Sequence, residues 1–163
     1  DMPNPKSTSW FEYPIRVQPH HTDYSGVVWH GTYITWMESA RVECLRSLGI
    51  SFEKLVGMGY DLPVVGLDIR YRQPLTLGMD AIVKTRLEPQ KGIRLNWCYE
   101  IETVGERPEL CITGKVTLVT VDMRDGGASH PGNRKVVRRL PDELKSAIAQ
   151  VEQHFSAHPT KPQ

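Results

Sequence analysis

The longest stretch of helical periodicity lies at residues 33–48. Apolar side chains recur there at intervals of three, four and seven residues: Tyr33, Trp36, Met37, Ala40, Cys44, Leu45 and Leu48. This spacing places them on one stripe of an α-helix. Gly49 follows directly and is a typical helix stop. The pattern therefore predicts a long helix with one wide buried face.

After this helix the period changes from 3.6 to 2. Apolar and polar side chains alternate in four segments, at residues 65–72, 81–88, 93–102 and 110–121, and more loosely at 10–17. Such alternation is typical of strands with one dry face. The connections are too short for crossover helices, so the sheet should be mostly antiparallel.

The remaining segments complete the predicted order of elements. A short helical turn is expected at 51–56, a Gly-rich loop at 125–133 and an amphipathic helix at 141–155. The polar ends, 1–9 and 158–163, are interpreted as frayed tails. One strand, one long helix and four strands predict an α+β domain over 10–124, followed by a C-terminal loop and helix with a frayed tail over 125–163. An uncovered sheet edge would favour a homo-oligomer.

Composition and charge exclude some classes of function but identify none. The 163 residues contain 20 basic and 19 acidic side chains, so no global field recruits nucleic acid or an anionic membrane. No apolar stretch is long enough to span a bilayer, and no signal peptide is evident. The three cysteines, Cys44, Cys98 and Cys111, lie in apolar-patterned segments and are interpreted as buried thiols in a reducing compartment. We therefore expect a cytoplasmic protein without membrane insertion.

Reactive side chains cluster just before the long helix, at His20, His21, Asp23 and His30. A metal site is disfavoured, because adjacent histidines project differently and no further ligand stands at a suitable spacing. Asp23 could instead be a turn residue. It could also act chemically, because the N-terminus of a helix offers free N–H groups that hold an oxyanion beside a carboxylate. The residues alone leave the last two interpretations open.

A resemblance adds to this interpretation. Thr22-Asp23-Tyr24-Ser25-Gly26-Val27-Val28-Trp29-His30-Gly31-Thr32-Tyr33, continued by Met37-Glu38-Ser39-Ala40-Arg41, resembles the signature of the 4-hydroxybenzoyl-CoA thioesterase family. That family includes Tol–Pal-associated and long-chain acyl-CoA thioesterases. The resemblance covers residues 11–121 and implies the hotdog fold, in which a mostly antiparallel five-stranded sheet wraps a long central helix. It also implies hydrolysis of an acyl- or aroyl-CoA to free acid and coenzyme A by a homodimer or tetramer, without a metal or other cofactor.

The resemblance assigns roles to individual positions. Asp23 matches the family's catalytic carboxylate, nucleophile or general base, and the backbone N–H of His30 matches the group that polarises the thioester carbonyl. Tyr24, Gly26 and Trp29, in the same signature, are expected to bind substrate. Many relatives carry Asp-Thr-Asp where this chain has His21-Thr22-Asp23, so a first carboxylate is missing here.

Further candidates lie outside the signature. Gly66 and Asp68 are expected to form part of the pocket wall that a second chain contributes. Arg134 and Arg138, in the basic run 134–139, could bind the anionic end of coenzyme A. The alternative for this run is a solvated charged segment, since it is short and lacks the interleaved aromatic residues of a nucleic-acid site.

Two other functions remain possible at this stage. A non-catalytic acyl-CoA-binding protein would have no use for a carboxylate at the scissile carbonyl. A hotdog hydratase or dehydratase would need a histidine base in a pattern that is missing here, because Gly31-Thr32 follows His30. The sequence does not determine whether the acyl group is aromatic or aliphatic. Trp29, Trp36 and Trp97 could line an aromatic pocket or belong to the core, where Tyr33 is also expected.

Overall fold

A computed structural model describes residues 10–127 and 129–156. Its main sheet contains five strands: β1 (Phe11–Arg16), β3 (Val64–Tyr71), β4 (Asp80–Leu87), β5 (Leu95–Thr103) and β6 (Leu110–Leu118). They lie in the order β1-β4-β5-β6-β3, and every neighbouring pair is antiparallel. The predicted five strands and their antiparallel direction are therefore confirmed.

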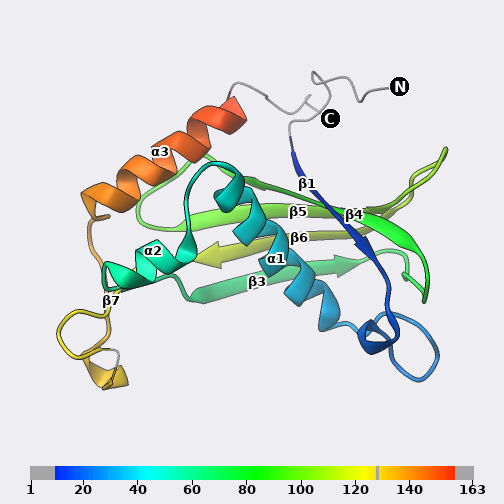
Figure 1. The fold of residues 1–163 in the computed structure, drawn as a ribbon, viewed down its shortest axis with the longest axis horizontal. Coiled ribbons are helices and arrows are strands. Elements are labelled where there is room, and N and C mark those ends of the chain that lie inside the picture. The colour runs from blue at the N-terminus through cyan, green and yellow to red at the C-terminus, as the bar shows by residue number, and fades with distance from the viewer. Residues whose placement is uncertain (1–9, 128, 157–163) are drawn as a thin grey trace.

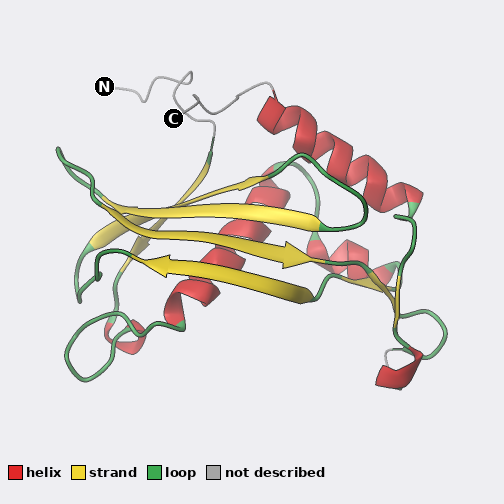
Figure 2. Cartoon of the chain, turned by 180° about the vertical axis from the view of Figure 1, so that it is seen from behind, coloured by secondary structure: helices red, strands yellow, loops and turns green. Residues whose placement is uncertain are grey.

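The long helix α1 (Thr32–Ser47) lies across one face of this sheet (Figure 1). The view from behind shows that no helix of the described residues covers the opposite face (Figure 2). Tyr33, Trp36 and Met37 are buried on the predicted stripe. Trp97 of β5 is buried beneath the helix as well. Burial of one helix stripe on one sheet face is the predicted α+β arrangement, because each element hides its apolar side against the other.

Two further helices extend the same core. The short helix α2 (Phe52–Gly57) begins at Ser51, whose hydroxyl accepts the Lys54 N–H at 3.1 Å. Helix α3 (Asp142–Ser156) buries four side chains in the core that α1 and the sheet share: Leu144, Ile148, Val151 and Phe155. The C-terminal segment therefore packs against the sheet domain.

A small second sheet joins distant parts of the chain. Its strands, in spatial order, are β2 (Tyr60–Asp61), β7 (Val121–Asp122) and β8 (Lys135–Val136). The predicted strand at 110–121 is thus divided, because β7 leaves the main sheet to pair with β2. Single 3₁₀ turns occupy Pro19–His21 and Pro131–Asn133. The predicted tails, 1–9 and 158–163, lie outside the described residues.

Strand β3 departs from the prediction of a dry face. Leu67 and Tyr71 pair with the buried Val116 and Ile112, yet both are about half exposed. The reason is position: β3 is the last strand of the sheet, and α1 packs against β1 and β4 at the other side. An apolar sheet edge is left uncovered. Within the described residues, no helix combines the length and apolar character needed to cross a membrane.

Candidate active site

The loop before α1 folds as a small closed hairpin. The Trp29 N–H donates to the His21 carbonyl at 3.0 Å, and the Asp23 N–H donates to the Val27 carbonyl at 2.8 Å. Gly26 at the tip has φ +75°, a left-handed conformation that favours glycine. These bonds close the turn that carries Asp23 and join its base at His21 to Trp29, just before the helix.

The two carboxylate oxygens of Asp23 have different environments. Oδ1 accepts the N–H groups of Ser25 at 2.8 Å and Val27 at 3.2 Å, which forms an Asx turn. Oδ2 has no hydrogen bond to any described residue, and the side chain is exposed. The turn interpretation and the chemical interpretation are therefore compatible, because they concern different oxygens of the same side chain.

The first backbone N–H groups at the start of α1 are unpaired. Those of His30 and Gly31 make no hydrogen bond to a described residue, whereas Thr32 N–H already donates to the Trp29 carbonyl at 2.9 Å. No side chain caps the helix at Gly31. Free amides at a helix N-terminus carry partial positive charge and suit a developing oxyanion. The hairpin brings these groups and the Asp23 carboxylate into one loop.

A tyrosine from β3 reaches this loop. The Tyr71 hydroxyl donates to the His30 carbonyl at 3.0 Å. A hollow of about 220 Å³ beside it is lined by His30, Tyr33, Tyr71, Arg72 and Gln73, among others. The sequence pattern placed Tyr71 only on the dry face of a strand, and no local signal could have linked it to a residue 41 positions earlier.

His21 has a structural role in the loop. Its Nδ1 accepts the Gln18 N–H at 2.9 Å, and its ring lies edge-on to Trp36 with the centroids 5.1 Å apart. Burial, and next the neighbouring His20, lower the pKa of the His21 imidazole. Within the described residues, no three His, Cys, Asp or Glu side chains are placed to hold a metal ion.

Two other predicted site residues lie in the same hairpin. Tyr24 is fully exposed at its tip. Trp29 is 54% exposed and packs against His30, with ring centroids 4.8 Å apart. Trp29 thus differs from the buried Trp36 and Trp97, which belong to the core.

The remaining predicted site residues lie away from Asp23 in the same chain. Gly66 and Asp68 are on β3, and Asp68 pairs with Arg70 at 3.4 Å. Arg134 donates from Nε to the Gly127 carbonyl at 2.9 Å, and Arg138 is exposed. Both arginines belong to the segment around β8, at the opposite end of α1 from the hairpin (Figure 1). One chain alone does not bring them to the carboxylate.

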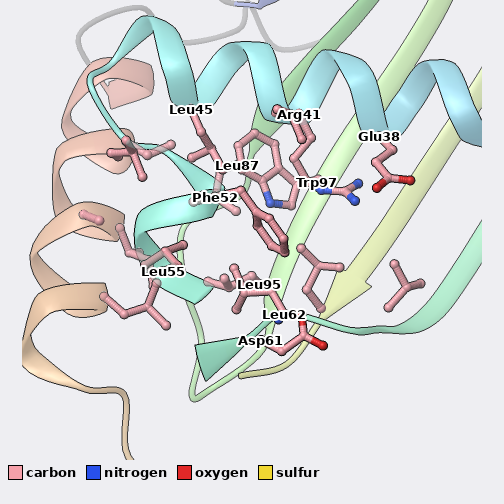
Figure 3. A pocket seen from close by; sticks show the side chains of 18 of the residues that line it. Glu38, Arg41, Leu45, Phe52, Leu55, Asp61, Leu62, Leu87, Leu95 and Trp97 are labelled. Carbon is pink, nitrogen blue, oxygen red and sulfur yellow. Dashed lines mark hydrogen bonds between the residues drawn. The ribbon is translucent and has the colours of Figure 1, made fainter. Parts of the chain in front are cut away.

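A larger cavity of about 290 Å³ lies between α1, α2, α3 and the sheet (Figure 3). Apolar side chains form most of its wall: Phe52, Leu55, Leu95, Trp97, Ile148 and Val151. Glu38, Arg41 and Asp61 are its charged members, and Glu38 lies on the side away from α3 (Figure 3). Arg41 also donates to the Tyr99 hydroxyl at 3.0 Å. No local pattern in the sequence indicates this cavity, because seven separate segments of the chain line it.

Known proteins match both the sequence and the fold. The family model of the thioesterase-like superfamily matches residues 17–150. The chain is 48% identical to sll0410 of Synechocystis sp., whose proposed activity is that of an esterase, over 88% of this chain and 81% of that protein. It is 29% identical to the acyl-CoA thioester hydrolase YbgC of Escherichia coli, over 71% of this chain and 85% of YbgC.

A solved structure, the DHNA-CoA thioesterase of Staphylococcus aureus, superposes with a TM-score of 0.76 at 26% identity. The superposition covers 93% of this chain and 97% of that one. The resemblance noted in the sequence is therefore confirmed, and so is the hotdog fold. The chain belongs to the thioesterase-like superfamily, a family of hotdog-fold thioester hydrolases.

Proposed function

We propose that this protein hydrolyses an acyl-CoA thioester to the free acid and coenzyme A. One observation carries the proposal: a carboxylate oxygen of Asp23 has no hydrogen bond to a described residue, in a closed loop that leads directly into a helix start whose His30 and Gly31 N–H groups have none either. A carboxylate and an oxyanion site are the two components that acyl transfer to water requires.

In the proposed reaction Asp23 acts through Oδ2. It either attacks the thioester carbon or removes a proton from the attacking water. The His30 N–H donates to the carbonyl oxygen as negative charge develops there, and the dipole of α1 assists. The carbon–sulfur bond then breaks, coenzyme A leaves as the thiol, and the oxygen of water remains in the acid.

A second copy of the chain completes the site in this proposal. The β3 edge offers unpaired backbone groups beside half-exposed apolar side chains, which is the type of edge that a partner strand covers. A two-fold axis would pair β3 with its copy in antiparallel orientation. The Tyr71 end, which contacts the hairpin, would then lie beside the partner's Val64 end, and Val64 lines the large cavity.

The acyl group would enter that cavity of the partner as a hydrocarbon chain. A cavity of about 150 Å³ holds benzene, so 290 Å³ suits a chain of roughly ten carbons. The wall towards α3 offers no polar partner, and burying an unpaired hydroxyl costs about 1–3 kcal/mol. We therefore expect an aliphatic acyl-CoA to be preferred over 1,4-dihydroxy-2-naphthoyl-CoA, the substrate in the name of a solved structure with this fold.

The same pairing would bring the other candidate residues of the partner towards the hairpin. Strand β2 immediately precedes β3, and the small sheet links β2 to the segment of Arg134 and Arg138. The partner's basic segment would thus approach the hairpin from the end where coenzyme A must lie. Gly66 and Asp68, on β3 itself, would lie at the interface between the two copies.

The test is thiol release from short aliphatic, medium-chain, long-chain and aromatic acyl-CoAs by the wild type and Asp23→Asn. Asparagine keeps an oxygen for the Ser25 and Val27 N–H groups, so the loop should stay folded while the free carboxylate is lost. We expect turnover to fall at least about 100-fold. The matched control is Asp125→Asn, in an exposed loop, which should behave as the wild type.

Each outcome has a separate meaning. Turnover on the medium-chain substrates that collapses only in Asp23→Asn supports the proposal. Tight binding without turnover on the whole panel would indicate a binding protein instead. Turnover that survives Asp23→Asn would mean that another group carries the reaction.

A further inference from the structure

Tyr71 holds the start of α1 by a hydrogen bond that the proposed reaction does not use. Its hydroxyl donates to the His30 carbonyl at 3.0 Å, and its ring packs edge-on against Tyr33 with the centroids 5.7 Å apart. That carbonyl lies outside the helical ladder, because the Ile34 N–H donates to the Gly31 carbonyl at 3.2 Å. The Tyr71 side chain therefore donates a hydrogen bond to a carbonyl oxygen that accepts none within the helix.

The same peptide unit contains a free donor. The His30 carbonyl and the Gly31 N–H belong to one planar trans unit, in which the two bonds point in opposite directions. A group that fixes the direction of the His30 carbonyl consequently fixes the direction of the Gly31 N–H. Glycine itself restrains its backbone weakly, so an external restraint has an effect at this position. The Gly31 N–H finds no acceptor among the described residues.

Trp29 restrains the other side of this unit. Its ring lies so close to the Gly31 Cα that an added Cβ would overlap the ring atoms. The peptide between His30 and Gly31 is thus held at its oxygen by Tyr71, and the Trp29 ring lies against Gly31. The hydrogen bond fixes the direction of the peptide unit.

We propose that Tyr71 is a positioning residue that aims the Gly31 N–H at the thioester oxygen, as a second oxyanion donor beside the His30 N–H. This inference rests on the proposed function. A developing oxyanion can accept more than one hydrogen bond, and donors that are already oriented need no rearrangement during the reaction. Loss of the Tyr71 hydroxyl would leave the donor present but free to turn away.

The test is Tyr71→Phe, which removes the hydroxyl and keeps the ring against Tyr33. We expect kcat to fall about tenfold or more, since removal of a whole oxyanion donor costs about 100- to 1,000-fold. KM, melting temperature and oligomeric state should stay at the wild-type values. The matched control is Tyr13→Phe on β1, whose hydroxyl has no hydrogen bond to a described residue, and it should keep the wild-type kcat.

A second measurement does not depend on turnover. In protein labelled with ¹⁵N-glycine, the Gly31 amide resonance should move in Tyr71→Phe and stay in place in Tyr13→Phe. An unmoved resonance would overturn the proposal. A wild-type kcat in Tyr71→Phe would overturn it too, as would a raised KM at unchanged kcat. If Tyr71→Phe keeps its kcat while Asp23→Asn is inactive, only the positioning role fails. An inactive wild type refutes the proposed function itself.

Discussion

At the scale of single residues, Asp23 in the hairpin before α1 has a structural role and, in the proposed reaction, a chemical one. Asp23 uses one oxygen to close its turn and leaves the other free. His21 contributes its carbonyl, which accepts the Trp29 N–H and the Thr32 hydroxyl, both at 3.0 Å. Its imidazole accepts the Gln18 N–H only while Nδ1 is unprotonated. This bond makes the loop sensitive to acid.

We expect stability to fall as the pH drops below about 6.5, the ordinary pKa of histidine. The pKa of His21 is lowered in the folded protein, so the unfolded chain binds the proton more tightly. The stabilisation is therefore complete above the unfolded pKa and is lost as the pH falls toward the lower, folded pKa. Tyr13, Arg16 and His20 are the other charged or titratable groups that line the same groove.

Melting temperature between pH 5 and pH 8 tests this prediction. His21→Asn keeps an acceptor for the Gln18 N–H and removes the titration, so its profile should be flatter than that of the wild type. His130→Asn, in an exposed loop, is the matched control and should follow the wild type. Parallel profiles for the wild type and His21→Asn would contradict the prediction.

At the scale of elements, β3 and α3 have separate tasks. Strand β3 carries apolar side chains on an uncovered edge, while α3 closes the end of the large cavity. In the proposed function, the first task concerns assembly and the second concerns the length of the acyl group. Each can be changed without touching the hairpin that carries Asp23.

For β3 the change is Leu67→Glu, at a side chain that is 46% exposed. A charge there should prevent the strand from pairing with its copy, because the carboxylate would have to be buried. We expect a folded monomer with little thioesterase activity, measured by light scattering after gel filtration and by thiol release. Val104→Glu, at an equally exposed apolar residue beyond β5, should remain assembled and active. An active monomer would show that one chain holds the whole site.

For α3 the change is Ala147→Phe, at a small residue in the cavity wall. The added ring is about the size of benzene, which needs about 150 Å³, so it should fill roughly half of the cavity. The preferred acyl chain should then shorten by several carbons, while turnover of the shortest substrates remains. Ala149→Phe, on the exposed side of the same helix, should leave the chain-length profile unchanged. An unaltered profile for Ala147→Phe would place the acyl group elsewhere.

At the scale of the whole molecule, Cys44 and Cys111 are buried and Cys98 is half-buried. Burial raises the pKa of Cys44 to about 12, and burial together with the Glu88 carboxylate, 2.9 Å from Sγ, raises that of Cys98 to about 12. Burial raises the pKa of Cys111 as well. Only the thiolate reacts with a disulfide reagent, so the folded protein should react slowly at pH 8.

We expect less than one equivalent of thiol to react during a typical assay and all three after denaturation in guanidinium. Absorbance from an aromatic disulfide reagent, followed with and without denaturant, measures both. Rapid reaction of the native protein would contradict the predicted burial. The result also decides whether the same reagent reports released coenzyme A without background.

Much of the fold could be predicted because periodicity is a local property. The stripe of α1 and the alternation of β4 and β5 follow from backbone geometry, which repeats every 3.6 or every two residues. The buried Tyr33, Ala81, Val83 and Ile101 all lie where the pattern places them. The hairpin with Asp23 could also be located, since its chemistry is confined to ten consecutive residues.

The sequence by itself therefore determined the long helix, the strands of the main sheet, their order along the chain and the segment that carries the candidate chemistry. Only the tertiary structure decided that the apolar side of β3 is uncovered, that Tyr71 reaches the His30 carbonyl and that seven segments line a cavity. These features depend on where α1 lies across the sheet. That position results from contacts between residues far apart in the chain, which no local pattern of apolar and polar side chains records.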